Sequence, residues 1–150
     1  MTRQGNATRQ MTEIELGAWR GFLVSHSELV RRLDAELVAN HGLSLAAYDA
    51  LLFLHRAPDH RLRMTDLGQQ VLFTPSGISR LIDRLEVDRL VRRAPGPKDG
   101  RERLAELTEL GIERLREAAA THVAGVRRLF LDRFSEPELQ QLGDFWDRLR

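Results

Sequence analysis

The stretch FTPSGISRLIDRLEVDRLVRR, from Phe73 to Arg93, predicts a helix with two chemically different faces. Apolar side chains recur at helical spacing on one face, at Ile78, Leu81, Ile82 and Leu85. The opposite face and its flanks carry small hydroxyls and charges, at Ser76, Ser79, Arg80, Asp83 and Arg84. Such a helix either packs on a core with a merely solvated outer face or presents that face to a partner. The surrounding sequence has to decide between these alternatives.

This helix lies in the basic part of a chain whose formal net charge is only +1. Residues 61–103 hold ten Lys and Arg and six acidic residues, an excess of four positive charges, while the remainder has an excess of three negative charges. A local excess of this kind is compatible with binding to a polyanion. It is equally compatible with a solvated charged surface.

The segments on the C-terminal side of the helix predict a hairpin followed by two further helices. Strands are expected at 90–93 and 103–107, with Pro95, Gly96, Pro97 and Gly100 in the turn between them. A long helix is expected from Thr108 to Phe134. A capping box of Ser135 and Glu138 then opens a last helix, whose apolar residues are Leu139, Leu142, Phe145, Trp146 and Leu149.

The segments on the N-terminal side predict a flexible arm over residues 1–11 and a long helix over about 12–40. That helix carries a heptad-like apolar seam of Leu16, Trp19, Leu23, His26, Val30, Leu33 and Leu37. Ser44 is expected to cap a second helix that ends before Pro58, and Thr65 to cap a brief third one. Residues 61–63 read as a short extended segment. Thr74 suits the N-cap of the opening helix and Pro75 its first position.

Composition excludes several classes of protein. The 150 residues suffice for one domain with its own core. The absence of cysteine excludes disulfides, thiolate metal sites and thiol redox chemistry. The five histidines show no close metal-ligand spacing, so we expect no metal and no other cofactor. No nucleophile motif, phosphate loop or HExxH occurs, which predicts that the protein is not an enzyme. Without an apolar membrane span or signal segment, we expect a cytoplasmic protein.

Two short helices followed by a basic hairpin are typical of a winged helix-turn-helix, in which the second helix lies in a DNA major groove. The predicted fold is therefore mainly α with a small β-hairpin wing, flanked by long N- and C-terminal dimerisation helices. We expect a single domain over 12–150. Its DNA-binding lobe would span about 44–107, and its dimerisation helices about 12–40 and 108–150.

Three segments resemble the MarR family of winged helix-turn-helix transcription regulators. HGLSLAAYDALLFL resembles the family's second helix, SRLIDRLEVDRLVRR its recognition helix and first wing strand, and DGRERLAELTELG its wing signature. The residues that match this signature are Asp99, Arg101, Leu104, Leu107 and Thr108. The similarity covers about Glu13 to Arg150. Arg89 stands where the family usually has Gly, so we expect that turn to be built differently. Gly100, between Asp99 and Arg101, is expected to loosen the wing tip.

The resemblance implies a DNA-binding transcription regulator, a repressor, that acts as a homodimer on a pseudopalindromic operator and is released by a small aromatic or phenolic ligand. The apolar stripes of the two terminal helices agree with a dimer, because they exceed what the middle of the chain can cover and an isologous interface would bury them. The alternative is that both stripes pack inside one subunit. A different function on the same fold is a protein-interaction adaptor without specific DNA binding, which would not need the wing arginine.

Candidate DNA-binding residues follow from the polar face and from the wing. They are Thr74, Pro75, Ser76, Gly77, Ser79, Arg80 and Arg84 in the helix, and Lys98, Asp99, Arg101 and Arg103 in the wing. Arg80 can contact a guanine base or a phosphate. Arg84 can contact the DNA backbone, unless its side chain pairs with Asp88. We expect Arg80 or Arg84 to hold Asp83. Arg101 resembles the family arginine that enters a minor groove, and Asp99 the acid that pairs with it. The alternative is a hairpin salt bridge with no role in DNA binding.

The resemblance also implies a ligand pocket between the dimer helices and the DNA-binding lobe. The residues that could line it are Trp19, His26, Tyr48 and His55. The alternative is that these side chains belong to the core, where aromatic residues on an apolar stripe are usually found.

Overall fold

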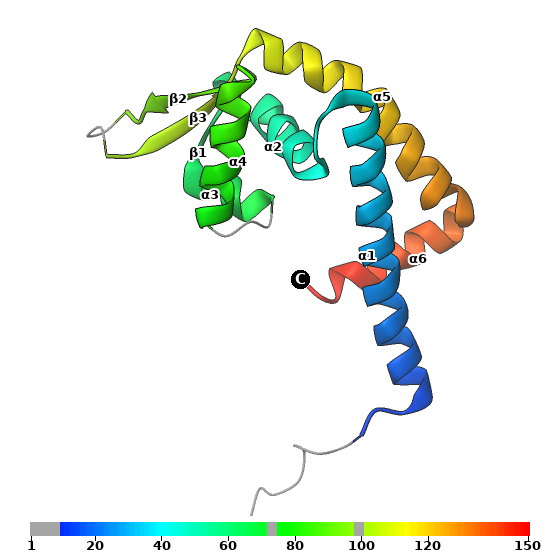
Figure 1. Ribbon diagram of the computed structural model, residues 1–150. Coiled ribbons are helices and arrows are strands. Elements are labelled where there is room, and N and C mark those ends of the chain that lie inside the picture. Colours follow the sequence, from blue (N-terminus) through cyan, green and yellow to red (C-terminus); the bar gives the residue numbers. More distant parts are fainter. Residues whose placement is uncertain (1–9, 72–74, 98–100) are drawn as a thin grey trace, which may run out of the picture.

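The computed structural model describes residues 10–71, 75–97 and 101–150. A lobe is formed by α2 (Leu45–Arg56), α3 (Met64–Gln70), α4 (Pro75–Val87) and a small sheet, and two long helices, α1 (Glu13–His41) and α5 (Glu109–Leu129), extend from it side by side (Figure 1). The last helix, α6 (Glu136–Asp147), crosses α1 far from the lobe (Figure 1). The mainly helical fold with a hairpin wing is confirmed. The predicted N-terminal arm falls largely on residues 1–9, outside the described residues.

The sheet contains three antiparallel strands in the order β1-β3-β2. They are β1 (Arg61–Arg63), β2 (Val91–Pro95) and β3 (Arg103–Leu107). Arg61 and Arg92 both lie opposite Glu106 of the central strand. The Nε of Arg61 is 3.0 Å from Oε2 of Glu106, and Arg92 donates to the other carboxylate oxygen. The short extended segment predicted at 61–63 is therefore an edge strand of the wing sheet.

The apolar face of α4 lies in the core of the lobe, as its spacing predicted. Ile78, Leu81, Ile82 and Leu85 are all at least nine-tenths buried. They join one apolar cluster with residues of the other lobe elements and the lobe ends of α1 and α5, including Leu37, Leu51, Leu54, Leu67, Val91 and Leu115. At about 25 cal/mol per Å² of apolar surface, burial of each such side chain contributes roughly 1.5–3 kcal/mol. The side of α4 opposite this cluster is left exposed.

Most helix ends agree with the sequence. The side chains of Ser44 and Thr108 accept hydrogen bonds from backbone N–H groups in the first turns of α2 and α5. Ser135 and Glu138 form the predicted capping box at the start of α6. Gly42 ends α1 with φ 65°. Two predictions are wrong. Thr65 lies inside α3, whose N-cap is Arg63 without a side-chain cap. The helix predicted to reach Phe134 ends at Leu129, followed by a 3-10 turn, η2 (Leu131–Arg133).

The turn from α4 into the wing keeps a left-handed residue although it lacks glycine. Arg89 has φ 59°, so the expectation of a differently built turn is wrong. The N–H of Leu90 bonds the carbonyl of Leu85 and the N–H of Arg89 that of Glu86, both at 2.9 Å, which is the hydrogen-bond pattern of a Schellman motif. The hydroxyl of Thr108 donates to the carbonyls of Arg89 and Leu90 at 2.7 and 3.0 Å. These bonds and the burial of Leu90 hold Arg89 in a conformation that costs a non-glycine residue about 1–2 kcal/mol.

The start of α5 is in direct contact with this turn. Gly111, in the first turn of α5, lies so close to the turn that a Cβ there would be 2.2 Å from the carbonyl oxygen of Leu90. The N–H of Gly111 also donates to the Thr108 hydroxyl at 3.0 Å. The C-terminal end of α4 is therefore joined to one of the two long helices through backbone contacts.

The long helices do not qualify as membrane spans. Within the described residues, no single helix is both long and apolar enough to cross a bilayer. Only α1 and α2 taken together pass a test of length and composition, across a bend of 81°.

Replacing Arg89 with Gly should raise the free energy of unfolding by roughly 0.5–1 kcal/mol, because glycine adopts φ 59° without steric cost and this gain exceeds the entropy that glycine adds to the unfolded chain. Urea unfolding measures the difference. The matched control is Asp88→Gly, one residue earlier, where there is no positive φ to relieve and stability should fall. An Arg89→Gly variant that is destabilised as much as Asp88→Gly would contradict this account of the turn.

Candidate nucleic-acid interface

The exposed side of α4 carries two arginines. Arg80 and Arg84 are both exposed, one helical turn apart, while Gly77 and Ser79 are half-buried beside them. Pro75 is the first residue of the helix, as predicted, and Ser76 follows it in the first turn. The proposed N-cap Thr74 lies outside the described residues. The structure thus places the arginines on the face opposite Ile78 and Ile82, where a partner can reach them.

The wing lies beside α4 and adds further arginines. In Figure 1 the β2–β3 hairpin projects from the lobe next to the α4–β2 turn. Arg101 and Arg103 are exposed at the beginning of the returning strand, and the N–H of Gly96 donates to the carbonyl of Glu102 at 2.8 Å to close the hairpin. Glu102 also accepts from Nε of Arg63 at 2.8 Å, which ties the wing to β1. Lys98, Asp99 and Gly100 fall outside the described residues.

Arg93 of β2 links the wing to α4, and the sequence did not single it out. Its Nη1 is 2.7 Å from Oδ1 of Asp83 and also bonds Glu86. The expectation that Arg80 or Arg84 would hold Asp83 is therefore wrong. Strand alternation could have revealed the contact, because Arg93 shares a face of β2 with the buried Val91. Partial burial lowers the pKa of the Arg93 guanidinium, but the two carboxylates raise it by more, so it lies above its ordinary value.

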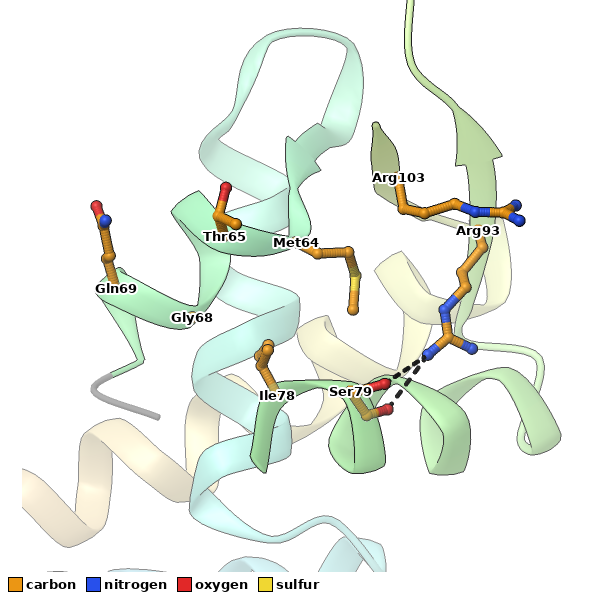
Figure 2. Close-up of a pocket in the computed structure, with 8 residues that line it drawn as sticks. All are labelled: Met64, Thr65, Gly68, Gln69, Ile78, Ser79, Arg93 and Arg103. Atoms are coloured by element: carbon orange, nitrogen blue, oxygen red, sulfur yellow. Dashed lines mark hydrogen bonds between the residues drawn. The ribbon is translucent and has the colours of Figure 1, made fainter. Parts of the chain in front are cut away.

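A cavity of about 520 Å³ opens between α3, α4 and the wing. Figure 2 shows its lining residues, Met64, Thr65, Gly68, Gln69, Ile78, Ser79, Arg93 and Arg103. The guanidinium of Arg93 points along α4, and its Nη2 lies 3.3 Å from the carbonyl oxygen and 3.4 Å from the hydroxyl of Ser79 (Figure 2). Side chains of α3, α4 and the wing thus border one concave surface.

The four residues predicted to line a ligand pocket lie in two separate places. Tyr48 is buried on α2 and, with His55 and the α5 residue Arg116, borders a cavity of about 190 Å³ between the two helices. Trp19 and His26 lie on α1 on either side of Phe22, each with its ring centre 6.1 Å from that of Phe22. His26 borders a larger apolar cavity of about 660 Å³ between α1 and α6.

The buried ring of Tyr48 packs on a second titratable side chain. The centres of the Tyr48 and His122 rings are 4.5 Å apart, and the buried Nδ1 of His122 has no hydrogen-bond partner within the described part of the chain. Burial lowers the pKa of His122, and the negative charge of Asp49 offsets this only in part. Burial likewise raises the pKa of the Asp49 carboxyl. Both pKa shifts favour the neutral form of the side chain at the contact between α2 and α5.

A second surface, at the far end of the long helices, is apolar. Phe22 of α1 and Trp146 of α6 have ring centres 5.5 Å apart, yet neither is buried. Trp19 is 51% exposed and Phe145 47%. Large apolar side chains on both helices thus remain open to solvent, although α6 packs across α1. An apolar patch of this kind is typical of a protein–protein contact.

Comparisons with known proteins agree with one another. A sequence model described as the MarR family matches residues 41–102. The HTH-type transcriptional repressor YetL of Bacillus subtilis is 32% identical over 114 residues, covering 74% of this chain and 68% of YetL. AbsC, a MarR family transcriptional regulator from Streptomyces coelicolor, superposes with a TM-score of 0.89 at 35% identity over 95% of each chain. Sco3205 from the same organism, solved in complex with DNA, gives 0.91 at 33% identity over 97% of this chain and 91% of its own.

Lowering the pH should destabilise the contact between Tyr48 and His122. Because burial holds the pKa of His122 below its ordinary 6.5, the unfolded chain binds the proton more readily. Folding stability is then lost as the pH falls through 6.5. A His122→Gln variant should lose less stability than the wild type in urea unfolding between about pH 7.5 and about pH 5.5 at one protein concentration.

An Asp49→Asn variant is the control for this experiment. Removal of the nearby carboxylate lowers the pKa of His122 further, so the loss of stability in acid should be at least as large as in the wild type. Equal pH dependence in the wild type and the His122→Gln variant would show that His122 does not govern it.

Proposed function

This chain belongs to the MarR family of transcription regulators, and on that premise we propose that it acts in the cytoplasm as a homodimeric repressor bound to a pseudopalindromic DNA operator. The observation that supports this most directly is the exposed polar face of α4 beside an arginine-bearing wing. Sco3205, which shares this fold at 33% identity, was solved with DNA. YetL is a transcriptional repressor, which supports repression as the mode of action.

In the proposed complex, α4 lies in the major groove of each half-site. Arg80 contacts a guanine edge or a phosphate, and Ser76 and Ser79 reach base edges or phosphates. Arg84 binds the DNA backbone. Gly77 allows close approach of the helix, and the first turn, from Thr74 and Pro75, directs backbone N–H groups at a phosphate. The DNA-binding lobe of this proposal spans residues 44–107.

The wing reaches the adjacent minor groove in this proposal. Arg101 enters it, with Asp99 as the brace, while Lys98 and Arg103 contact phosphates. A narrow A·T-rich minor groove has a more negative potential than average and attracts an inserted arginine. The exposure of Arg101 and Arg103 on the hairpin beside α4 supports this arrangement.

The apolar patch formed by α1 and α6 is the proposed dimer interface. Trp19, Phe22, Leu23, Phe145 and Trp146 are all more than one-third exposed in a single subunit. A two-fold contact between the paired ends of two chains would remove these side chains from water. Binding to a palindrome further requires that both copies of α4 face the same side of the duplex.

Release by a small aromatic or phenolic anion is the regulatory part of the proposal. The cavity of about 190 Å³ between α2 and α5 suits such a ligand, because Tyr48 and His55 offer polar groups beside apolar walls and Arg116 offers a positive charge. A ligand there would bear on the junction between the DNA-binding lobe and a long helix. Trp19 and His26 lie elsewhere and form no part of this site.

A gel mobility shift with the DNA upstream of the protein's own gene tests the proposal. We expect a discrete complex with this duplex and a much weaker one with a shuffled duplex of equal length, and release of the complex when benzoate is added. If benzoate has no effect, the ligand part fails while the DNA-binding part stands. If both duplexes bind equally or not at all, the winged-helix adaptor becomes the better description.

Replacing Arg80 with Ala should weaken operator binding by roughly 1–3 kcal/mol if the contact is to a base, and should relax the preference at that base pair. Thermal stability should barely change, because the side chain is exposed. Fluorescence anisotropy with a labelled operator measures the effect. The control is Arg127→Ala, which removes the same charge from an exposed position on α5. Wild-type affinity and preference in the Arg80→Ala variant would remove this residue from the interface.

The protein should sediment at micromolar concentration with a mass of about 34 kDa, twice the 17.2 kDa of one chain. Replacing Phe145 with Glu should shift it towards the single-chain mass, because the charge would be buried in an apolar interface. Val87→Glu is the control, since Val87 is an exposed apolar residue of α4 outside the proposed interface. A wild-type protein that remains a monomer and yet binds its palindrome tightly would contradict the dimer.

A further inference from the structure

Arg93 holds two turns of α4 with a single guanidinium. Its contacts fall on Ser79, Asp83 and Glu86, which follow one edge of the helix, and its own backbone N–H donates to Oε1 of Glu86 at 3.0 Å. The Arg93 side chain is 25% exposed, against 60% for Asp83 and 33% for Glu86. The guanidinium is therefore fixed by partners on both sides, and its planar shape fixes where each nitrogen points.

Nη1 is directed at the carboxylates, which leaves Nη2 for Ser79. Nη2 faces the backbone carbonyl of Ser79 at 3.3 Å and its hydroxyl oxygen at 3.4 Å (Figure 2). These are long hydrogen bonds, but the positive charge acts on the hydroxyl dipole over this distance as well. One lone pair of the serine oxygen therefore faces Arg93, so the hydroxyl proton points elsewhere.

A serine hydroxyl in this state is biased towards one chemical role. It normally donates one hydrogen bond and accepts others, so by itself it distinguishes poorly between base edges. With one lone pair engaged by Arg93 and its proton directed away from the cation, it is oriented to donate. In the major groove the acceptors are N7 of both purines, O6 of guanine and O4 of thymine, whereas cytosine presents only an amino group.

We propose that Arg93 is a positioning residue that determines specificity, because it fixes the Ser79 hydroxyl as a donor and so makes α4 select an acceptor-bearing base where Ser79 meets DNA. This inference rests on the proposed function, since it requires α4 in the major groove. Arg93 itself contacts no base. It acts through Ser79, and it also neutralises Asp83 and Glu86, whose charges would otherwise repel the phosphates.

Operator variants with single base-pair changes under α4, including 7-deazapurines that lack the N7 acceptor, test the proposal with the full-length protein. In the wild type, loss of the acceptor at one position should weaken binding about three- to tenfold, the range for a single hydrogen bond. The operator affinity of the Ser79→Ala variant should not change when that acceptor is removed. The Arg93→Lys variant keeps a positive charge beside the carboxylates but loses the planar guanidinium. Its operator affinity should likewise not change when the acceptor at the same position is removed. The double variant should show no further loss of preference.

Arg92→Met is the matched control, because Arg92 is the neighbouring wing arginine and is paired with Glu106 on the other side of the strand. It should keep the preference. Arg93→Met serves as a second variant, and thermal unfolding confirms that each variant is folded. If both Arg93 variants lose affinity equally on every duplex but keep the preference, or if Ser79→Ala keeps it, the inference is overturned. A wild-type protein that binds no duplex specifically would instead overturn the proposed function itself, which separates the two failures.

Discussion

The burial of one side of α4 is the constraint on which the rest of the molecule depends. Ile78, Ile82 and Leu85 lie in the core of the lobe, so the rotation of the helix about its axis is fixed. A rotation that exposed Arg80 and Arg84 less would expose these apolar side chains instead, at roughly 1.5–3 kcal/mol each. The polar face is therefore held outward by the hydrophobic effect and needs no contact of its own to stay there.

The arginines in the middle of the chain fall into two groups, those in ion pairs with carboxylates of the sheet and α4 and those outside such pairs. Arg61 and Arg92 pair with Glu106, Arg63 with Glu102, and Arg93 with Asp83 and Glu86, so these arginines hold the wing sheet together and fasten it to α4. The hydrogen bond from Arg92, opposed by partial burial and helped by Arg61, keeps the pKa of Glu106 below its ordinary value. The net positive charge of residues 61–103 therefore overstates the positive charge that is available to bind a polyanion. Arg80 and Arg84 lie outside these pairs.

Most features set by local spacing could be predicted from the sequence, with the cap expected at Thr65 as an exception, and those set by contacts between distant residues could not. The apolar spacing of α4 and the caps at Ser44 and Ser135 involve residues within one or two turns, and all of them were found. Three other contacts join segments that only the folded chain brings together. They are the pairing of β1 with β3, the bonds from Arg93 to α4 and the packing of His122 on Tyr48. The left-handed Arg89 was mispredicted for the same reason, since Thr108, nineteen residues later, helps to hold it.

The contact of Gly111 with the carbonyl of Leu90 couples α5 to the C-terminal end of α4. A Cβ at Gly111 would lie 2.2 Å from this oxygen, so the two backbones are in close contact and a displacement of α5 bears directly on the end of α4. The 21 residues of α5 extend about 30 Å at 1.5 Å per residue. A tilt of about 5° at the far end of such an arm displaces the other end by about 3 Å, the length of a hydrogen bond. A small change where the long helices meet would thus be enough to displace α4 by the length of a hydrogen bond, without any change in the exposed side chains of α4 itself.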